Sequence, residues 1–192
     1  HGYNVAVGYG ALSVQNAGAN AYNVAVGYEA GVAVSTGAQN TLIGGQAGQS
    51  LTTGEKNVAI GKAALSSEDT GDRNVAIGNG ALQTLNYDGS GYNVAVGYDA
   101  GVAMTTGVEN IIVGGLAGDA LTTGSYNVAM GSLALSTEDT GSRNTAIGNR
   151  ALNSLNYDGN GYNTAVGFDA GLSMTTGIEN TIIGGNAGDA LT

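Results

Sequence analysis

Asn4-Val5-Ala6-Val7-Gly8 is the first copy of the pattern that decides the fold of this chain. The motif consists of an asparagine, a β-branched residue, alanine or a larger aliphatic residue, then Val, Ile or Met, and a glycine. It occurs eleven times and divides the chain into 17- and 19-residue repeats, four of which complete a 70-residue super-repeat. A fixed period of this length is typical of solenoids, in which each repeat forms one turn of a stack.

Alternation within the motif predicts a short strand. Residues such as Val5 and Val7 point to one side, and the asparagine, the middle alanine and the glycine point to the other. Strands stacked about 4.8 Å apart would align the Val and Ile rows and make a rod of roughly 50 Å. We therefore predict an all-β fold, a parallel β-solenoid or β-roll of 17- and 19-residue coils. We interpret residues 1–192 as one continuous array of eleven coils within a longer fibre chain.

The second half of each coil must turn the chain back. In the glycine-rich coils, such as the one that contains residues 28–37, we expect an extended or irregular segment. Where Ala-Leu occurs, at Ala64-Leu65 and Ala134-Leu135, the sequence also allows a helical turn.

The small residues of the motif suggest association between chains. A flat row of alanines would suit close packing of one chain on another, and this row comprises Ala6, Ala25, Ala59, Ala76 and Ala95. Leu42, Ile112 and Ile182 replace the alanine once per super-repeat and would form apolar plugs on the same face. Three chains around an axis is the expected assembly, and a monomeric solenoid with a solvated small-residue face is the alternative.

Composition excludes several classes of function. The chain has 35 glycines, no proline, cysteine or tryptophan, and a formal net charge of −10. Nucleic acid is not an expected partner, because five Lys and Arg cannot form a basic surface in this acidic field. No apolar run approaches the roughly 20 residues that span a bilayer, so we expect no membrane insertion. With a single histidine and no cysteine, we expect neither an enzyme nor a protein-bound cofactor.

The array resembles a known family of repeats. Thr53-Gly54-Glu55-Lys56-Asn57-Val58-Ala59-Ile60-Gly61-Lys62-Ala63-Ala64-Leu65 is similar, position by position, to the repeat arrays of bacteriophage tail fibres. The motif is also similar, less closely, to the head repeats of trimeric autotransporter adhesins, whose repeats are shorter. The resemblance implies a left-handed parallel β-roll in a homotrimeric fibre. It also implies an extracellular location, on a virion or a cell surface, and attachment to a host receptor or glycan.

The motif asparagines are expected to form a structural ladder, because stacked amides can hydrogen-bond along the solenoid or cap the turns. The ladder comprises Asn23, Asn40, Asn57, Asn74, Asn93, Asn110, Asn127, Asn144 and Asn163.

The 19-residue coils carry the candidate binding residues. Two insertions resemble the oxygen-rich first half of a calcium loop, although the later bidentate glutamate is missing. The candidate calcium ligands are Asn86, Asp88 and Ser90 in one insertion, and Asn156, Asp158 and Asn160 in the other. An ordinary Asp-Gly turn is the alternative interpretation of both.

Aromatic residues gather around the same insertions. A tyrosine beside Asp and Asn can stack on a sugar ring while the polar groups bind its hydroxyls. The candidate glycan contacts are Tyr87, Tyr92, Tyr98, Tyr157, Tyr162 and Phe168. The alternative is a stack of rings that covers the longer loop, with the hydroxyls left in water.

Two acidic pairs recur one super-repeat apart, Glu68-Asp69 and Glu138-Asp139. We interpret them as solvated turns with ion pairs to Arg73 and Arg143, each worth under about 1 kcal/mol. Paired carboxylates can also cleave glycosides.

The function we expect is therefore a stiff structural fibre segment with attachment to a host surface or glycan. The alternatives are a monomeric glycan- or ice-binding β-solenoid and a polysaccharide-degrading tailspike.

Overall fold

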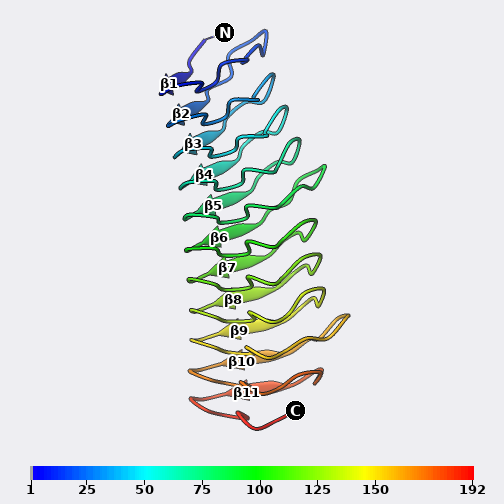
Figure 1. Ribbon diagram of the computed structural model, residues 1–192. Helices are drawn as coiled ribbons and strands as arrows, with labels where there is room; N and C mark the ends of the chain where they lie inside the picture. The colour runs from blue at the N-terminus through cyan, green and yellow to red at the C-terminus, as the bar shows by residue number, and fades with distance from the viewer. Residues whose placement is uncertain (1) are drawn as a thin grey trace.

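The fold is a stack of eleven coils, each with one short strand. The computed structural model describes residues 2–192, so His1, the chain's only histidine, lies outside it. The strands are β1 (Val5–Val7), β2 (Val24–Val26), β3 (Thr41–Ile43), β4 (Val58–Ile60), β5 (Val75–Ile77), β6 (Val94–Val96), β7 (Ile111–Val113), β8 (Val128–Met130), β9 (Thr145–Ile147), β10 (Thr164–Val166) and β11 (Thr181–Ile183). Figure 1 shows the coils in chain order from one end of the rod to the other.

All strands belong to one parallel sheet, in which each strand pairs with the strands before and after it in the chain. Equivalent motif residues are partners, as with Ala59 and Ala76 of β4 and β5. The register is the same across a 19-residue step, where Ala76 pairs with Ala95. The parallel β-solenoid and its coil lengths are therefore confirmed. The two additional residues of the long coils lie outside the sheet.

The second half of each coil consists of turns and bends, and no helix occurs within residues 2–192. The helical turn considered for Ala64-Leu65 and Ala134-Leu135 is therefore wrong. Each of the first ten coils instead places at least four residues at positive φ. In the fourth coil these are Gly61, Ala63, Leu65 and Arg73, at 133°, 56°, 53° and 58°. Residues other than glycine rarely adopt this conformation, and its regular recurrence lets the chain reverse direction in few residues.

The middle residue of each strand points into the solenoid. Ala25, Ala59, Ala76 and Ala95 are fully buried, and only Ala6, in the terminal first coil, is exposed. The prediction that this row is a flat outer face for chain packing is therefore wrong. Alanine is the residue here because the interior is narrow. Leu42, Ile112 and Ile182 also lie inside, so these larger residues fill the core and form no surface plug.

A second column of core residues comes from the turn region, seven positions after each motif glycine. In seven coils the residue is aliphatic and buried: Val34, Leu51, Leu85, Met104, Leu121, Leu155 and Met174. In the fourth and eighth coils the same position holds Glu68 and Glu138, and both are fully buried as well. Two carboxyl groups thus stand in a column that is otherwise apolar from the second coil onward.

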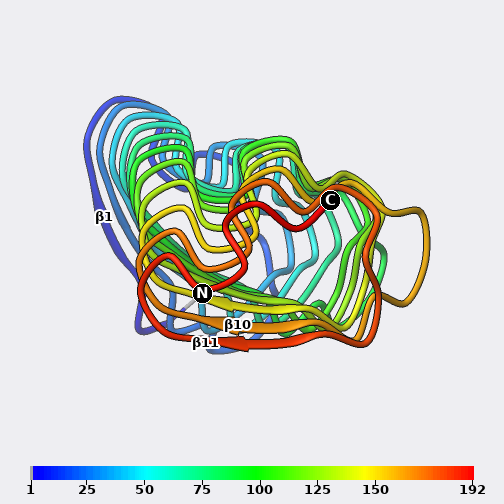
Figure 2. The ribbon, with the colours of Figure 1, turned by 90° about the horizontal axis from the view of Figure 1, so that it is seen from below.

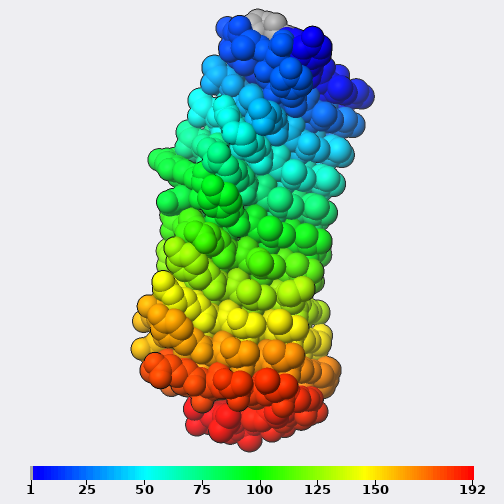
Figure 3. Space-filling view, turned by 180° about the vertical axis from the view of Figure 1, so that it is seen from behind, coloured from blue at the N-terminus to red at the C-terminus, as the bar shows by residue number. Residues whose placement is uncertain are grey.

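The rod has a nearly constant cross-section. Seen along its axis, the coils follow similar outlines, with projecting loops on one side (Figure 2). In the space-filling view the coils form successive bands of one continuous, elongated body (Figure 3). The long coils that contain β5 and β9 extend beyond their neighbours at the edge opposite the sheet labels in Figure 1.

Candidate interaction surface

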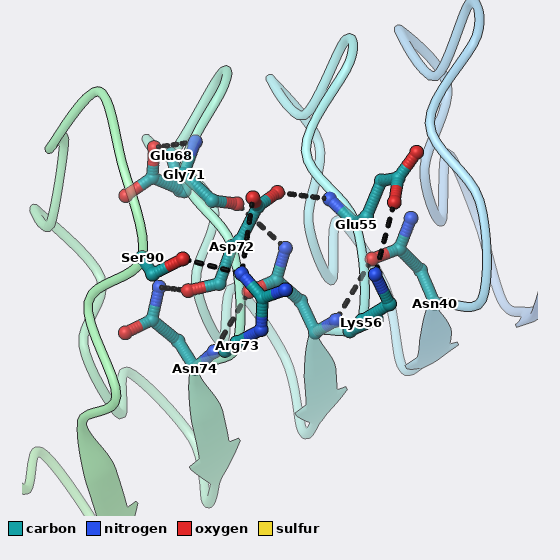
Figure 4. A network of polar contacts seen from close by, with 10 residues as sticks. Asn40, Glu55, Lys56, Glu68, Gly71, Asp72, Arg73, Asn74 and Ser90 are labelled. Atoms are coloured by element: carbon teal, nitrogen blue, oxygen red, sulfur yellow. Dashed lines mark hydrogen bonds and ion pairs between the residues drawn. The ribbon is translucent and has the colours of Figure 1, made fainter.

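The motif asparagines form one continuous column inside the rod. Each Asn side-chain oxygen, Oδ1, accepts a hydrogen bond from the backbone N–H of the asparagine in the next coil, at 2.8–3.3 Å. Asn40 and Asn74 in Figure 4 belong to this column. All nine asparagines of the expected ladder take part, from Asn23 to Asn163, and all are at most 1% exposed. Their amides are therefore used within the rod and are not presented to a ligand.

The same side chains also close their own coils. Asn57 Nδ2, for example, donates to the carbonyl oxygen of Gly71 at 2.7 Å, fourteen residues later in the same coil. Asn74 and Asn144 begin two of the long coils and differ. Their Nδ2 groups donate to the carbonyls of Asp72 and Ser142, at 3.2 and 3.4 Å. A long coil is thus fastened to the coil before it.

The outer face of the sheet is the largest candidate surface. The first and third residues of every strand point outward and are partly or fully exposed, and from β2 onward they form two rows along the rod. The first row is Val24, Thr41, Val58, Val75, Val94, Ile111, Val128, Thr145, Thr164 and Thr181; the second is Val26, Ile43, Ile60, Ile77, Val96, Val113, Met130, Ile147, Val166 and Ile183. The predicted alignment of the Val and Ile rows is confirmed. The chain presents these rows, and not its alanines, as its extended apolar face.

A shallow depression lies at the edge of this face. It is lined by Tyr92 and Glu109, each near the end of its coil, and by Ile111 of the first row. It is open to solvent and does not enclose a small molecule.

The six candidate glycan contacts do not converge on one site. Tyr92 and Tyr162 precede strands, Tyr98 and Phe168 follow the same strands, and Tyr87 and Tyr157 lie in the long loops. Tyr92 and Tyr98 stand about 20 Å apart along an extended chain, farther than one sugar ring reaches. Glycan binding stays a prediction, and the arrangement favours separate contacts along the rod.

Several exposed aromatic rings along the rod, Tyr162 among them, already have a partner on one face. Tyr3 stacks on Tyr22 at a centroid separation of 5.2 Å, and Tyr9 stacks on Tyr28 at 5.7 Å. The guanidinium of Arg143 lies between Tyr126 and Tyr162, 4.9 and 5.8 Å from the ring centroids.

Other rings pair with single arginines. Arg73 lies over Tyr92 at 5.7 Å, and Arg150 lies over Phe168 at 5.5 Å. Such contacts order the exposed side chains at the two edges of the sheet.

The two loop tyrosines pack onto their own loops. A Cβ built on Gly89 would lie 3.0 Å from the Tyr87 ring, and one on Gly159 would lie 3.1 Å from the Tyr157 ring. Tyr157 also packs against the core. Each of these two rings therefore lies against a glycine of its own loop.

The candidate calcium oxygens take part in hydrogen bonds to the preceding coil. Thr70 Oγ1 donates to Asp88 Oδ1 at 2.6 Å, and Arg73 Nη1 donates to Ser90 Oγ. In the second loop Thr140 Oγ1 donates to Asp158 Oδ1, and Arg143 Nη1 to Asn160 Oδ1, both at 2.8 Å. Asn86 and Asn156 are placed at the start of each loop by backbone hydrogen bonds to the following coil, with Thr105 and Thr175 as acceptors.

A calcium ion would have to displace an arginine from Ser90 or Asn160. Within the described part of the chain, no three His, Cys, Asp or Glu residues group closely enough to hold a metal ion. Calcium binding stays a prediction, and thermal unfolding with and without a chelator tests it.

The acidic pairs are not solvated turns. Glu68 and Glu138 are fully buried, and the expected ion pairs do not form: Arg73 lies 3.6 Å from Asp72, and Arg143 bonds Asn160. Burial raises the pKa of both glutamates above its usual value, and backbone N–H groups bonded to the carboxylates oppose that rise. Buried carboxylates are also out of reach of a polysaccharide. The missed signal was that the same position is aliphatic in seven other coils.

Residues 2–192 contain no helix that is long and apolar enough to cross a membrane. In comparisons with known proteins, no protein-family model, no curated protein and no solved structure matches this chain.

Proposed function

We propose that this chain is a stiff structural segment of a fibre, and that copies of it associate in threes through the outer face of the sheet. The observation that carries the proposal is the pair of exposed apolar rows that runs along ten successive strands. The threefold assembly, the location on a virion or cell surface and the attachment to a host surface are taken from the resemblance to tail-fibre and adhesin repeats.

Stiffness follows from how each coil is held. Every junction between coils has parallel backbone pairing in the sheet and at least one asparagine hydrogen bond in the interior. Ten such junctions at about 4.8 Å give a rod about 48 Å long. Because each coil contacts its neighbours along its whole length, bending the rod would break several of these bonds at once.

The outer face has the chemistry of an interface and the area of a large apolar patch. A strip about 48 Å long and about 10 Å wide exposes on the order of 500 Å² per chain, in the upper part of the range for the largest apolar patch of a typical monomer. Its residues are Val, Ile, Thr and one Met, and none is charged. A formal charge of −10 over the rest of the chain disfavours contact through the other faces.

The regular spacing of the side chains on this face favours a partner with the same spacing. Ridges of β-branched side chains recur at the strand spacing of about 4.8 Å. A second copy of the chain carries the same spacing and can match these ridges along the whole rod. A globular protein lacks such a repeat, so the proposed partner is another copy.

Light scattering of the purified segment at low concentration tests the assembly. We expect three times the mass of one chain, which is 18.8 kDa. The double variant Ile60→Lys/Ile77→Lys places two charges on the outer face and should yield monomers. Thr106→Lys adds a charge at an exposed turn residue and should leave the trimer unchanged. The mass of a single chain for the unmodified protein would contradict the proposal.

A monomer would favour the second candidate, a glycan- or ice-binding solenoid. Thr145, Thr164 and Thr181 are successive partners in the first outer row and present three hydroxyl groups in line. Thermal hysteresis and binding to immobilised glycans then separate ice from sugar as the ligand.

The tailspike alternative predicts release of reducing ends from a polysaccharide, which an end-group assay measures directly.

A further inference from the structure

The two buried glutamates occur where the coil length changes. Glu68 lies in the 17-residue coil before the 19-residue coil of β5, and Glu138 lies in the coil before that of β9. At the same position the residue is Val, Leu or Met in eight of the other nine coils, and Gln15 in the first coil. From the second coil onward, the apolar column is therefore interrupted only at the two described junctions where a 17-residue coil is followed by a longer one.

At most junctions, the residue after the column position donates its backbone N–H to the carbonyl of the equivalent residue in the following coil. The N–H of Thr52 donates to the carbonyl of Asp69 in the following coil at 2.7 Å. The same pair forms where a long coil is followed by a regular one, from Asn86 to Thr105 at 2.8 Å. The pairing therefore depends on the following coil, which supplies the acceptor.

Where the following coil is the long one, the Glu68 carboxylate takes the place of this pairing. The N–H of Asp69 donates to Glu68 Oε1 at 3.1 Å, and the N–H of Tyr87, in the long coil, donates to Oε2 at 3.2 Å. Gly71 N–H donates to Oε1 at 2.7 Å (Figure 4). One side chain thus satisfies three backbone donors from two coils.

The second junction repeats two of these three hydrogen bonds. Gly141 N–H donates to Glu138 Oε1 at 2.7 Å, and Tyr157 N–H donates to Oε2 at 3.1 Å. An aliphatic side chain would leave these N–H groups without their acceptors, a loss that folded proteins rarely tolerate in the interior.

The glycine beside the carboxylate makes room for it. A Cβ built on Gly71 would lie 2.6 Å from Glu68 Cδ. Gly54 leaves the same space for Leu51 in a regular coil, so this glycine lets the glutamate enter the column without a change in the backbone.

The loop that follows is fastened to the preceding coil. Asp72 N–H donates to the Gly89 carbonyl at 2.8 Å, and Gly91 N–H donates back to the Asp72 carbonyl at 3.0 Å. Ser142 and Asn160 form the equivalent bridge in the second copy. These bonds hold the two insertions, residues 86–91 and 156–161, in defined positions where they project from the rod (Figure 1).

We infer that Glu68 and Glu138 are positioning residues that join a 17-residue coil to a 19-residue coil and thereby hold the projecting loops 86–91 and 156–161 in place. The carboxylate supplies the acceptors that a longer following coil does not offer. The rod can therefore display an ordered loop once per super-repeat without a break in its sheet. This role holds for a monomer and for a trimer, so it does not rest on the proposed function.

A double-mutant cycle in the full chain tests the inference. The first change is Glu68→Leu, which restores the residue type of regular coils. The second replaces residues 86–91 by the four residues found at 122–125, which turns the coil of β5 into a 17-residue coil.

Hydrogen exchange at Asp69 and Tyr87 is the readout. In the long coil we expect Glu68→Leu to lower the protection of both amides by at least about tenfold, since both lose their acceptor. In the shortened coil, which lacks Tyr87, the Asp69 N–H can pair with a carbonyl of the following coil, as the Thr52 N–H does with Asp69. The same substitution should therefore leave exchange at Asp69 unchanged or slow it. The amides of Gly141 and Tyr157, which bond the unaltered Glu138, serve as the internal control. Equal effects on Asp69 in the long and the shortened coil would overturn the inference.

Two further variants test the inference if Glu68→Leu fails to fold. Glu68→Gln has only one acceptor oxygen, so either the Gly71 or the Tyr87 amide should lose protection while the other keeps it. Leu121→Glu places a carboxylate at a junction of two regular coils, where the Thr122 N–H already pairs with the Asp139 carbonyl, and should lower the thermal midpoint. Unchanged protection of both amides in Glu68→Gln would contradict the role of Glu68 as their acceptor.

Discussion

Leu42 fills the space that Gly31 leaves open in the preceding coil. A Cβ built on Gly31 would lie 2.5 Å from Leu42 Cδ1, and one on Gly48 would lie 2.8 Å from Leu42 Cδ2. In other coils the arrangement is reversed: Leu65 stands where Gly31 and Gly48 stand, and the strand residue is Ala59. A large residue thus stands either at the middle of the strand or four residues after the motif glycine, and the interior stays filled along the rod.

Leu42→Ala should empty this space and lower the free energy of unfolding by about 3 kcal/mol. Adding Gly31→Leu should recover part of the loss, because leucine adopts the same positive φ at Leu12 and Leu65, 48° and 53°. Urea unfolding of both variants measures the effect. If the added leucine destabilised Leu42→Ala further, the exchange of volume would be disproved.

Asn110→Ala should cost about 2 to 4 kcal/mol, because it leaves the buried N–H of Asn127 and the carbonyl of Gly124 without their partners. Asn180→Ala is the matched control, since Asn180 is only partly buried in the terminal coil. Its cost should be clearly smaller. Chemical unfolding of the two variants side by side checks this, and equal costs would argue against the column as a source of stability.

Gly97→Ala should prevent stable stacking at the centre of the rod. Gly97 has φ +145°, and a Cβ there would overlap the carbonyl oxygen of Gly114 in the next coil. We expect a loss of about 3 kcal/mol or more. Gly115→Ala is the control, because nothing lies within 4 Å of a Cβ built there and its φ is not in the restricted range. Thermal unfolding followed by circular dichroism compares them, and a similar midpoint for both would refute the steric argument.

Stability should rise as the pH falls through the range in which the buried glutamates take up protons. Burial raises the pKa of Glu68 and Glu138 in the folded state, so the folded chain binds these protons at a higher pH than the unfolded chain does. The resulting contribution of the two glutamates to the free energy of unfolding is fully present below the unfolded-state pKa and is lost as the pH rises through the folded-state pKa.

The difference in unfolding free energy between the unmodified chain and Glu68→Gln/Glu138→Gln isolates this effect from other carboxylates. On acidification the difference should shift in favour of the unmodified chain. A difference that stays constant, or that shifts the other way, would show that the N–H bonds to the carboxylates outweigh their burial.

The periodicity of the motif was sufficient to predict the coil lengths, the parallel sheet and the alignment of the Val and Ile rows. It did not predict which side of each strand faces inward. Both sides are apolar, one with alanine and the other with Val and Ile, and alternation alone distinguishes two faces without ranking them. The structure buries the alanines because a 17-residue coil encloses too little space for two rows of larger side chains.

The sequence by itself determined the repeat, and with it the order and register of the strands, because identical coils stack best with equivalent residues in contact. The tertiary structure alone decided the environments of Glu68 and Leu42. A carboxylate in an acidic turn looks solvated until the neighbouring coil is seen to cover it and to offer it backbone N–H groups. Burial depends on the preceding and following coils, which are distant in the chain, and it therefore cannot be deduced from any single repeat.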